Sequence, residues 1–327
     1  SGTFFLLLET EDAERDECLF AVGKRDGHKV HVTEIGDLDE FVSMAVFPAA
    51  GFEGALACTM SADGTLLFSD GKRAWSELVV PESFNADGTR NRRRMRTINF
   101  VDGALVATGF HGQVYRRHAE QPWEEISFTH PDLVGGHAVF YHAITSSEGN
   151  LACAGIFAHS RELSDELKAA SAAKDAKLFR AIKRAQKKSD HILVAEFRQE
   201  WTILYTDLPG VASWFRRRPN GGYYLVSASG IVWQTEDFLD LELLSQPETP
   251  QGFDDIELWH GEPVFFQNEK LLSLGEEGLE TFEPPLPDDA LPGLSLWSTE
   301  NALLFAQKDA LWILDSDAWV RLDLVRA

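Results

Sequence analysis

Cysteine and long apolar runs are both scarce in this sequence. Its 327 residues include 3 cysteines, Cys18, Cys58 and Cys153, an odd number without the paired spacing of a disulfide framework. No apolar run approaches the roughly 18 residues that a membrane-spanning helix needs. The first residues also lack the charged start and cleavage site of a signal peptide. We therefore expect reduced, buried thiols and a soluble cytoplasmic protein that does not contact a membrane.

Positive charge is also in short supply. The chain has 30 Lys and Arg against 52 Asp and Glu, which gives a formal net charge of −22. The phosphates of a nucleic acid repel such a charge, so no nucleic-acid partner is expected. Hydrophobic residues make up 44% of the chain and charged residues 25%, the usual balance of a globular protein. The composition predicts a folded protein whose acidic surface attracts basic partners.

A repeated pattern marked by tryptophan runs through the sequence. About eight residues before each of Trp75, Trp123, Trp201 and Trp319 stands a short apolar run that is typical of a strand. Two more apolar runs lie upstream in each unit, and the first of these ends in an aromatic residue, as in 97–100. Each unit therefore contains four strands, and the tryptophan opens the fourth.

Seven such units account for the chain. Six begin near residues 42, 94, 136, 210, 252 and 291, and the stretch Thr3–Leu38 makes a seventh. Without one insertion of about 30 residues, each unit averages about 42 residues, the size of a four-stranded propeller blade. We predict an all-β, seven-bladed β-propeller that forms a single domain over residues 1–327. The N-terminal strand is expected to complete the last blade.

A large β-sandwich is the competing interpretation of the same strands. A sandwich does not require tryptophan to recur at one offset after the third strand of each unit, whereas a ring of equivalent blades does. Aromatic residues at a fixed blade position are most simply packing residues, because each buries a large apolar area between neighbouring sheets. We expect this structural role for most of the 9 tryptophans.

Two segments resemble a known family. The run from Gly109 to Arg117, followed by Trp123-Glu124-Glu125-Ile126, resembles the repeat of bacterial propellers of the sialidase-type (BNR, or photosystem-assembly-factor-like) group. Ser61-Ala62-Asp63-Gly64-Thr65 is similar to part of the Asp-box of that group, although the compact order of the full box is absent. The resemblance implies the propeller fold and says little about activity. WD-repeat proteins match less well, because no unit ends in Trp-Asp.

One insertion, residues 158–191, separates the second and third strands of blade four. Apolar residues recur there at helical spacing, and a break near 171–175 predicts a helical hairpin. Between Ser160 and Asp190 there are nine Lys and Arg and five Asp and Glu, a net charge of +4 on an acidic protein. The insertion either rests on the acidic body as a cap, offers a site to an anionic partner, or is simply a solvated helix.

Loops of one face carry the residues that we expect to bind a partner or ligand. In a propeller, the connections after the second and fourth strands of every blade share a face, because the strands alternate in direction. The loop Pro81–Arg96, the loop His130–His137 and the insertion all belong to this face. The predicted binding residues are Arg90, Arg92, Arg93, Arg94, Arg96, His111, His137, Lys183, Arg184, Lys187 and Lys188.

Enzyme signatures are sparse. The sequence has no Gly-x-Ser-x-Gly elbow, phosphate loop or His-Glu-x-x-His, and its cysteine spacing excludes a zinc knuckle. A sialidase-type site needs arginines gathered over the pore, but residues 216–218 are expected in a loop of the opposite face. His111, His130, His137 and His142 would have to converge to bind a metal. We assign no catalytic residue, metal or cofactor.

The leading hypothesis is a non-catalytic protein-binding propeller of the immunity or adaptor type. It would use its acidic surface and its decorated loop face to bind a protein partner with a basic surface. The alternative is a hydrolase or small-ligand-binding propeller, with its site at the mouth of the central channel under the helical insertion as a lid. A self-associating scaffold is a third possibility.

Overall fold

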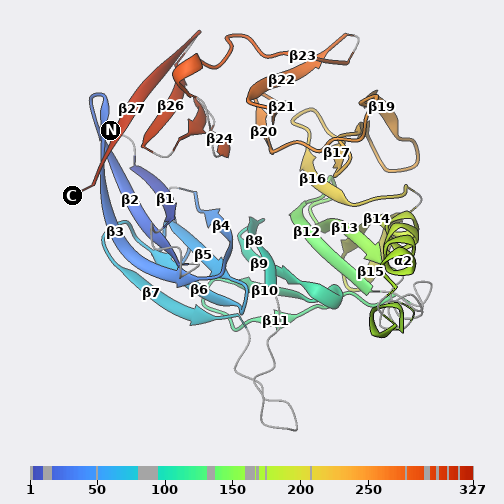
Figure 1. Cartoon of the computed structure of the whole chain (residues 1–327). Coiled ribbons are helices and arrows are strands. Elements are labelled where there is room, and N and C mark those ends of the chain that lie inside the picture. Colours follow the sequence, from blue (N-terminus) through green and yellow to red (C-terminus); the bar gives the residue numbers. More distant parts are fainter. Residues whose placement is uncertain are drawn as a thin grey trace. The chain divides into compact units, whose positions relative to one another are not determined.

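The structure is a computed structural model (Figure 1). It describes residues 3–9, 17–48, 51–79, 95–130, 137–158, 166, 169–173, 175–206, 208–276, 278–290, 295–299, 302–307, 309–315 and 317–326. These residues form two compact units. The first unit comprises Ser1–Leu8, Leu19–Gly36 and Arg218–Ala327, and the second comprises Glu9–Cys18 and Asp37–Arg217.

Three four-stranded antiparallel sheets make up most of the second unit, and each runs in chain order from first strand to fourth. The sheets are β4 (Phe41–Val46), β5 (Ala57–Ser61), β6 (Thr65–Ser69) and β7 (Ala74–Leu78); β8 (Met95–Val101), β9 (Ala104–Gly109), β10 (Val114–His118) and β11 (Glu124–Glu125); β12 (His137–Thr145), β13 (Leu151–Ala158), β14 (His191–Phe197) and β15 (Trp201–Tyr205). The next repeat begins with β16 (Ala212–Arg217).

The first unit contains the remaining repeats. Their strands are β17 (Tyr223–Ser227), β18 (Val232–Thr235) and β19 (Glu242–Ser245); β20 (Asp255–Trp259), β21 (Glu262–Gln267), β22 (Lys270–Gly275) and β23 (Gly278–Thr281); β24 (Ser295–Thr299), β25 (Ala302–Ala306), β26 (Ala310–Asp315) and β27 (Ala318–Arg326); β1 (Thr3–Glu9), β2 (Glu17–Asp26) and β3 (Lys29–Asp39). The six predicted repeat starts lie within four residues of the first residues of β4, β8, β12, β16, β20 and β24, so the repeat prediction is confirmed.

The N-terminal repeat departs from the prediction. Strands β24 to β27 supply all four strands of the last repeat, so the N-terminal strand does not complete it. Instead, β3 pairs in parallel with β27, with Lys29 opposite Asp323, and extends this sheet to the order β1-β2-β3-β27-β26-β25-β24. Only three strands of the N-terminal repeat occur among the described residues. Because β27 is already the fourth strand of the last repeat, β1 does not take that position.

The core lies between successive sheets. Second strands such as β5 and β9 are buried along their whole length, which explains their continuous apolar runs. One core cluster joins Phe68 of β6 to Leu105 of β9, and another joins Val106 of β9 to Leu193 of β14. The first strands β4, β8, β12 and β16 lie next to one another within the second unit. Stacked sheets with adjacent first strands are the arrangement expected of propeller blades.

The repeated tryptophans connect each sheet to the preceding one. The indole Nε1 of Trp123 donates a hydrogen bond to Glu77 Oε1 at 2.8 Å, and that of Trp201 donates to the Ile126 carbonyl at 2.7 Å. Trp319 does the same in the first unit, where its Nε1 donates to the Pro284 carbonyl at 3.0 Å. Each of these tryptophans lies within one residue of the start of the fourth strand of its sheet and donates a hydrogen bond to the repeat before it. The predicted packing role is confirmed for these three residues.

A five-residue turn recurs between strands. In Ser61–Thr65, the Ser61 hydroxyl accepts a hydrogen bond from the Thr65 backbone N–H at 3.1 Å, and Gly64 has a φ of +87°. The turns 146–150 and 227–231 show the same serine-to-amide bond, each with a glycine at positive φ in the fourth position. Glycine is needed there because other residues are strained in the left-handed region. The Asp-box-like segment is thus a turn that the fold uses more than once.

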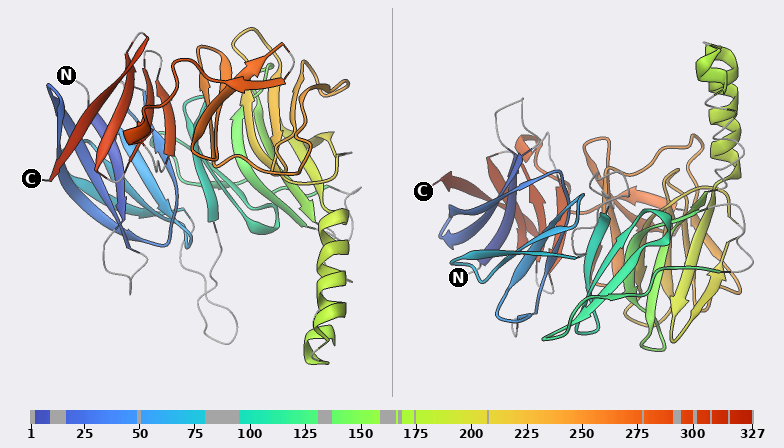
Figure 2. Two further views of the ribbon diagram at one scale, coloured as in Figure 1. Left: turned by 45° about the horizontal axis from the view of Figure 1, so that its top comes forward. Right: turned by 90° about the horizontal axis from the view of Figure 1, so that it is seen from below.

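Helix α2 (Ala176–Ser189) lies in the predicted insertion and projects from the strands of the second unit (Figure 2). Its N-cap Asp175 accepts hydrogen bonds from the backbone N–H groups of Lys177 and Leu178 at 3.1 and 3.0 Å, which places the predicted break correctly. Leu178 is 48% exposed, whereas Ile182 is buried. Among the described strands of the second unit, none makes extensive contact with α2.

Candidate binding sites in the second unit

The structure brings three predicted binding residues to one end of the sheets. Arg96 is the second residue of β8, His111 lies in the 3-10 segment η1 (Phe110–Gly112) between β9 and β10, and His137 opens β12. The rings of His111 and His137 are 5.0 Å apart. The Arg96 guanidinium carbon lies 5.4 Å from the ring centre of Phe110 and 5.1 Å from that of Tyr141. We call these five residues the Arg96 cluster.

The other predicted binding residues are not part of this cluster. Arg90, Arg92, Arg93 and Arg94 lie outside the described residues. Lys183, Arg184, Lys187 and Lys188 lie in the last two turns of α2, where the Arg184 side chain is exposed. Of these four side chains, the structure describes only that of Arg184.

The four histidines do not converge. Burial lowers the pKa of His137, as does the nearby His111, while Asp190 opposes both effects. His142 lies farther along β12, and its Nε2 is 2.8 Å from the Ser213 carbonyl. The His130 ring instead stacks on Phe128, with ring centres 6.4 Å apart. Among the described residues there is no group of three His, Cys, Asp or Glu side chains that is arranged to hold a metal ion.

Two of the arginines expected in a loop are strand residues. Arg216 and Arg217 belong to β16, and the Arg216 guanidinium lies 3.4 Å from Nδ1 of His142. Because an arginine only donates hydrogen bonds, Nδ1 must accept and Nε2–H must donate to Ser213, which fixes a neutral imidazole. Burial, followed by the Arg216 charge, lowers the pKa of His142 to about 3. These residues therefore join two sheets.

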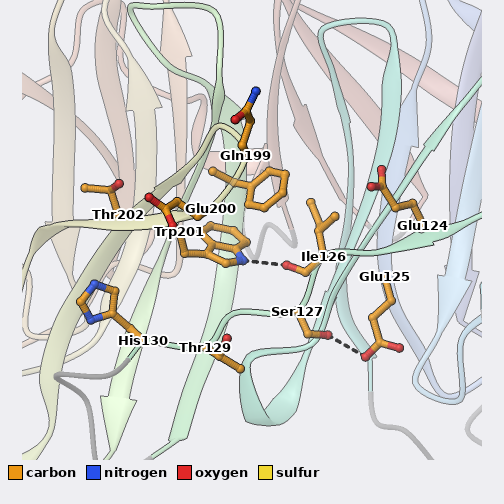
Figure 3. A pocket seen from close by; sticks show the side chains of 11 residues that line it. Glu124, Glu125, Ile126, Ser127, Thr129, His130, Gln199, Glu200, Trp201 and Thr202 are labelled. Carbon is orange, nitrogen blue, oxygen red and sulfur yellow. Dashed lines mark hydrogen bonds between the residues drawn. The ribbon is translucent and has the colours of Figure 1, made fainter.

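A groove that the sequence did not reveal lies between the sheets β8–β11 and β12–β15 (Figure 3). It has a volume of about 690 Å³, and we call it the outer groove because the fourth strands β11 and β15 border it. Its lining residues are Glu124, Glu125, Ile126, Ser127, Thr129, His130, Phe197, Gln199, Glu200, Trp201 and Thr202.

Aromatic side chains form the base of the outer groove. Trp201 is only 8% exposed and packs on Phe128, Phe140 and Phe197, with ring centres 5.2 to 5.7 Å apart. Its bond to the Ile126 carbonyl joins the two walls (Figure 3). Phe197 is half-buried beside it. The base of the groove is therefore rigid and largely apolar.

Carboxylates also line the outer groove. Glu124 pairs with Arg116 at 2.8 Å, and Glu125 accepts a hydrogen bond from the Ser127 hydroxyl at 2.9 Å. Glu200 is exposed at the opposite wall. No Lys or Arg is among the lining residues, but the guanidinium carbon of Arg116 lies 5.5 Å from the ring centre of Phe197. An acidic rim above an apolar base suits a basic side chain with a long aliphatic stem.

Sequence reasoning missed this groove because its two walls are about 75 residues apart and acidic residues are common throughout the chain. The available signal was local. Glu124 and Glu125 directly follow Trp123, and Glu200 directly precedes Trp201, so acids flank the repeated tryptophan in two successive repeats. The repeat alone places the two tryptophans in neighbouring sheets, but it does not show that the seam between their outer edges stays open.

Comparison with known proteins shows the fold. The chain is similar to YCF48 bound to a D1 peptide, with 14% identity, a TM-score of 0.55, and coverage of 86% of this chain and 82% of that one. It is also similar to the WD40 β-propeller domain of Doa1, with 11% identity, a TM-score of 0.56 and coverage of 98% and 96%. The chain is also similar to the β-propeller domain of Cps50 (Swd1) from Myceliophteria thermophila, with 12% identity, a TM-score of 0.52, and coverage of 99% of this chain and 96% of that one.

Neither a protein-family model nor a curated protein matches the chain. None of the helices in the described part of the chain is long and apolar enough to cross a membrane. At identities of 11 to 14%, the structural likenesses speak to architecture and not to activity. Together with the repeated four-stranded sheets, they confirm the predicted fold class, an all-β propeller.

Proposed function

We propose that this protein is a non-catalytic, protein-binding propeller that holds a basic, extended segment of a partner protein in the outer groove. The observation that carries the proposal is an aromatic base, formed by Trp201 and Phe197, with an acidic rim on which Arg116 pairs with Glu124 while the Glu125 and Glu200 side chains are exposed. A groove of about 690 Å³ accommodates a few residues rather than a whole protein surface. The partner therefore contributes a short segment to this contact.

The chemistry of the groove favours lysine or arginine in that segment. The aliphatic stem of such a side chain packs on Trp201, while its charged end reaches Glu125 and Glu200. A hydrogen bond between two charged groups is stronger than a neutral one, so the rim adds affinity as well as orientation. The net charge of −22 attracts a basic partner over a longer range and speeds the encounter.

Propellers with bound peptides support this type of function in general. YCF48, a structural neighbour of this chain, is seen with a D1 peptide. We carry over only the general mode, in which a propeller binds a protein segment. An immunity or adaptor role, a cytoplasmic location, membership of the BNR-like group and a single domain over residues 1–327 remain our proposals, because composition and repeat pattern alone support them.

Site-specific cross-linking tests where a partner binds. A photo-cross-linking amino acid replaces Thr202 at the rim of the outer groove, and a second variant carries it at Thr33, an exposed residue of β3. In extract from the native host, we expect the Thr202 variant to capture one protein through a segment rich in Lys or Arg, identified by mass spectrometry. Capture by both variants alike, or through an acidic segment, contradicts the proposal.

Charge reversal then measures the contribution of the rim. A synthetic peptide of the captured segment should bind at least about tenfold more weakly to Glu125→Lys/Glu200→Lys, since loss of a charge-assisted contact costs about 1.5 to 3 kcal/mol. The matched control is Glu34→Lys/Glu248→Lys, which reverses two exposed acids outside the groove. If both double variants weaken binding equally, the peptide senses only the net charge and the groove is not the site.

A further inference from the structure

The Arg96 cluster is shaped by two β-bulges in adjacent first strands. In β8, Met95 is paired with Gly109 and Thr97 with Thr108, which leaves Arg96 without a partner in the ladder. In β12, Phe140 is paired with Gly155 and His142 with Ala154, which leaves Tyr141 unpaired in the same way. A bulge takes one side chain out of the regular alternation and re-aims it. Both re-aimed side chains meet, with the Arg96 guanidinium over the Tyr141 ring.

The Arg96 guanidinium lies over two aromatic rings. Its guanidinium carbon lies 5.4 Å from the centre of the Phe110 ring and 5.1 Å from that of Tyr141, and the side chain is exposed. It forms no hydrogen bond or ion pair with any residue that the structure describes, although the chain contains 52 acidic residues. The N–H groups lie in the guanidinium plane, so contacts through the rings do not use them.

Two imidazoles complete the cluster. His111 has a φ of +58°, and the adjacent Gly112 has a φ of +75° and approaches the Phe128 carbonyl so closely that a Cβ would lie 2.7 Å from it. This contact constrains the backbone of η1, and the His111 ring lies 5.0 Å from that of His137. A bulge in β8, the tight turn of η1 and the start of β12 therefore place Arg96, His111 and His137 at one end of the sheets.

We propose that the Arg96 cluster binds a phosphate group. Three nitrogen-bearing side chains at one end of the sheets match the several oxygens of a phosphate monoester, whereas a carboxylate offers only two oxygens. Asp190, the acidic group that faces His137, disfavours anions there, so the ligand must carry enough charge to overcome it. Free phosphate compounds and a phosphorylated side chain share this chemistry.

Titration with defined anions tests the proposal. Histidine-detected NMR follows the His111 and His137 resonances of the full chain as inorganic phosphate, a phosphoserine peptide, its unphosphorylated form, or acetate is added. We expect both phosphate compounds to shift these resonances and to raise the pKa of His137, because a bound anion favours the charged imidazole. Unphosphorylated peptide and acetate should bind at least about tenfold more weakly than their phosphorylated or phosphate counterparts.

Variants separate recognition from folding. Arg96→Gln should weaken phosphate binding by at least about tenfold, the effect of losing a charge-assisted fork. Arg73→Gln is the matched control, because Arg73 also lies over an aromatic ring, Trp75 at 5.9 Å, but is paired with Asp70 and has no imidazole pair beside it. Near-ultraviolet circular dichroism checks that both variants remain folded.

The outcomes divide cleanly. Tighter binding of the phosphoserine peptide than of inorganic phosphate identifies a protein-borne source, and the reverse order identifies a free compound. Equal affinity for acetate and phosphate, no shift with millimolar phosphate, or an equal loss in Arg73→Gln and Arg96→Gln overturns the proposal. The result is independent of the outer groove, because Glu125→Lys/Glu200→Lys leaves the Arg96 cluster intact and should still bind phosphate.

Discussion

The sheet β8–β11 packs against the sheet β4–β7 on one side and against β12–β15 on the other, and we call each of these interfaces a seam. Charged side chains are arranged differently in the two seams. Arg116 and Arg117 are successive residues of β10, so their side chains leave opposite faces of the sheet. Arg117 enters the seam with β4–β7, where it is 9% exposed and donates hydrogen bonds to Glu77 Oε2 at 2.7 Å, to Glu53 and to the Gln121 carbonyl. Arg116 faces the outer groove.

The two glutamates that Arg117 contacts in the first seam each have a further partner. Glu77 also accepts from the Trp123 indole, and Glu53 from the Glu120 backbone N–H. We call this network of Glu53, Glu77, Arg117 and Trp123 the closed seam. In the outer groove, Arg116 pairs with Glu124 alone, and the indole of Trp201 bonds to a carbonyl instead of a carboxylate. One repeat geometry thus yields a seam in which a buried arginine contacts two glutamates, and a groove lined by exposed glutamates.

The largest effect is expected from the aromatic base of the outer groove. Trp201→Ala should lower the free energy of unfolding by about 3 to 5 kcal/mol, because it removes a buried indole from contact with three aromatic rings. Trp123→Ala in the closed seam should cost less, since Trp123 is only half-buried. Urea midpoints measure both. Equal losses would mean that the outer groove is loosely packed at its base as well as open at its rim.

The second largest loss of stability is expected when the closed seam loses its arginine. Arg117→Met should destabilise the fold by about 3 kcal/mol, because it leaves the Glu53 and Glu77 carboxylates close together without their cation. Arg116→Met removes an ion pair with an exposed acid and should cost less than about 1 kcal/mol. Urea unfolding of the two variants compares adjacent residues of one strand.

A compensated variant checks the cause of that loss. Arg117→Met/Glu53→Gln/Glu77→Gln removes the stranded charges along with the cation, so it should recover part of the stability lost by Arg117→Met. If the triple variant is less stable than the single one, the arginine stabilises the seam mainly by packing on Phe52, whose ring centre lies 5.6 Å from its guanidinium carbon.

A third seam, between β12 and β16, should be sensitive to pH. The unfolded His142 titrates near 6.5, whereas its pKa in the fold is about 3, so between these values the unfolded chain binds a proton that the folded chain does not. Stability is therefore fully present above pH 6.5 and falls as the pH drops. At pH 5 the loss is about 2 kcal/mol.

The control for this titration is another histidine. His142→Gln should reduce the difference between the urea midpoints at pH 7 and pH 5, while His118→Gln, at an exposed position of β10, should leave it unchanged. If both variants keep the full pH dependence, other groups cause it, and the neutral hydrogen-bonded pair of His142 and Ser213 does not control this seam.

The repeat made most of the fold predictable. Tryptophan at a fixed offset and continuous apolar second strands depend only on local spacing, and they located six repeat starts. The parallel pairing of β3 with β27 depends on two segments almost 300 residues apart, and no local pattern specifies it. The spacing of apolar residues in the insertion predicted a helical hairpin. That spacing did not show whether the apolar side chains pack on strands or within the insertion.

The sites were less predictable because they depend on bulges and seams. Strand direction placed Arg96, His111 and His137 at one end of the sheets, and the structure brings them together. The bulges that aim Arg96 and Tyr141 are invisible in a pattern of alternating residues. The outer groove was missed because Glu200 and Glu125 differ from dozens of other acids only in what lies between them.

The smallest effect is expected for the rim of the outer groove, and it distinguishes a binding surface from a structural one. Glu125→Gln and Glu200→Gln should each change the free energy of unfolding by less than about 0.5 kcal/mol, as is usual for surface positions. Removing charge from an acidic rim lowers repulsion, so any change should be a gain that fades as salt is added. Glu77→Gln in the closed seam should instead destabilise, because it weakens the bond to a buried arginine. If the rim variants destabilise the protein as much as Glu77→Gln does, the carboxylates of both seams stabilise the fold. The rim of the outer groove is then a structural feature and not a binding surface.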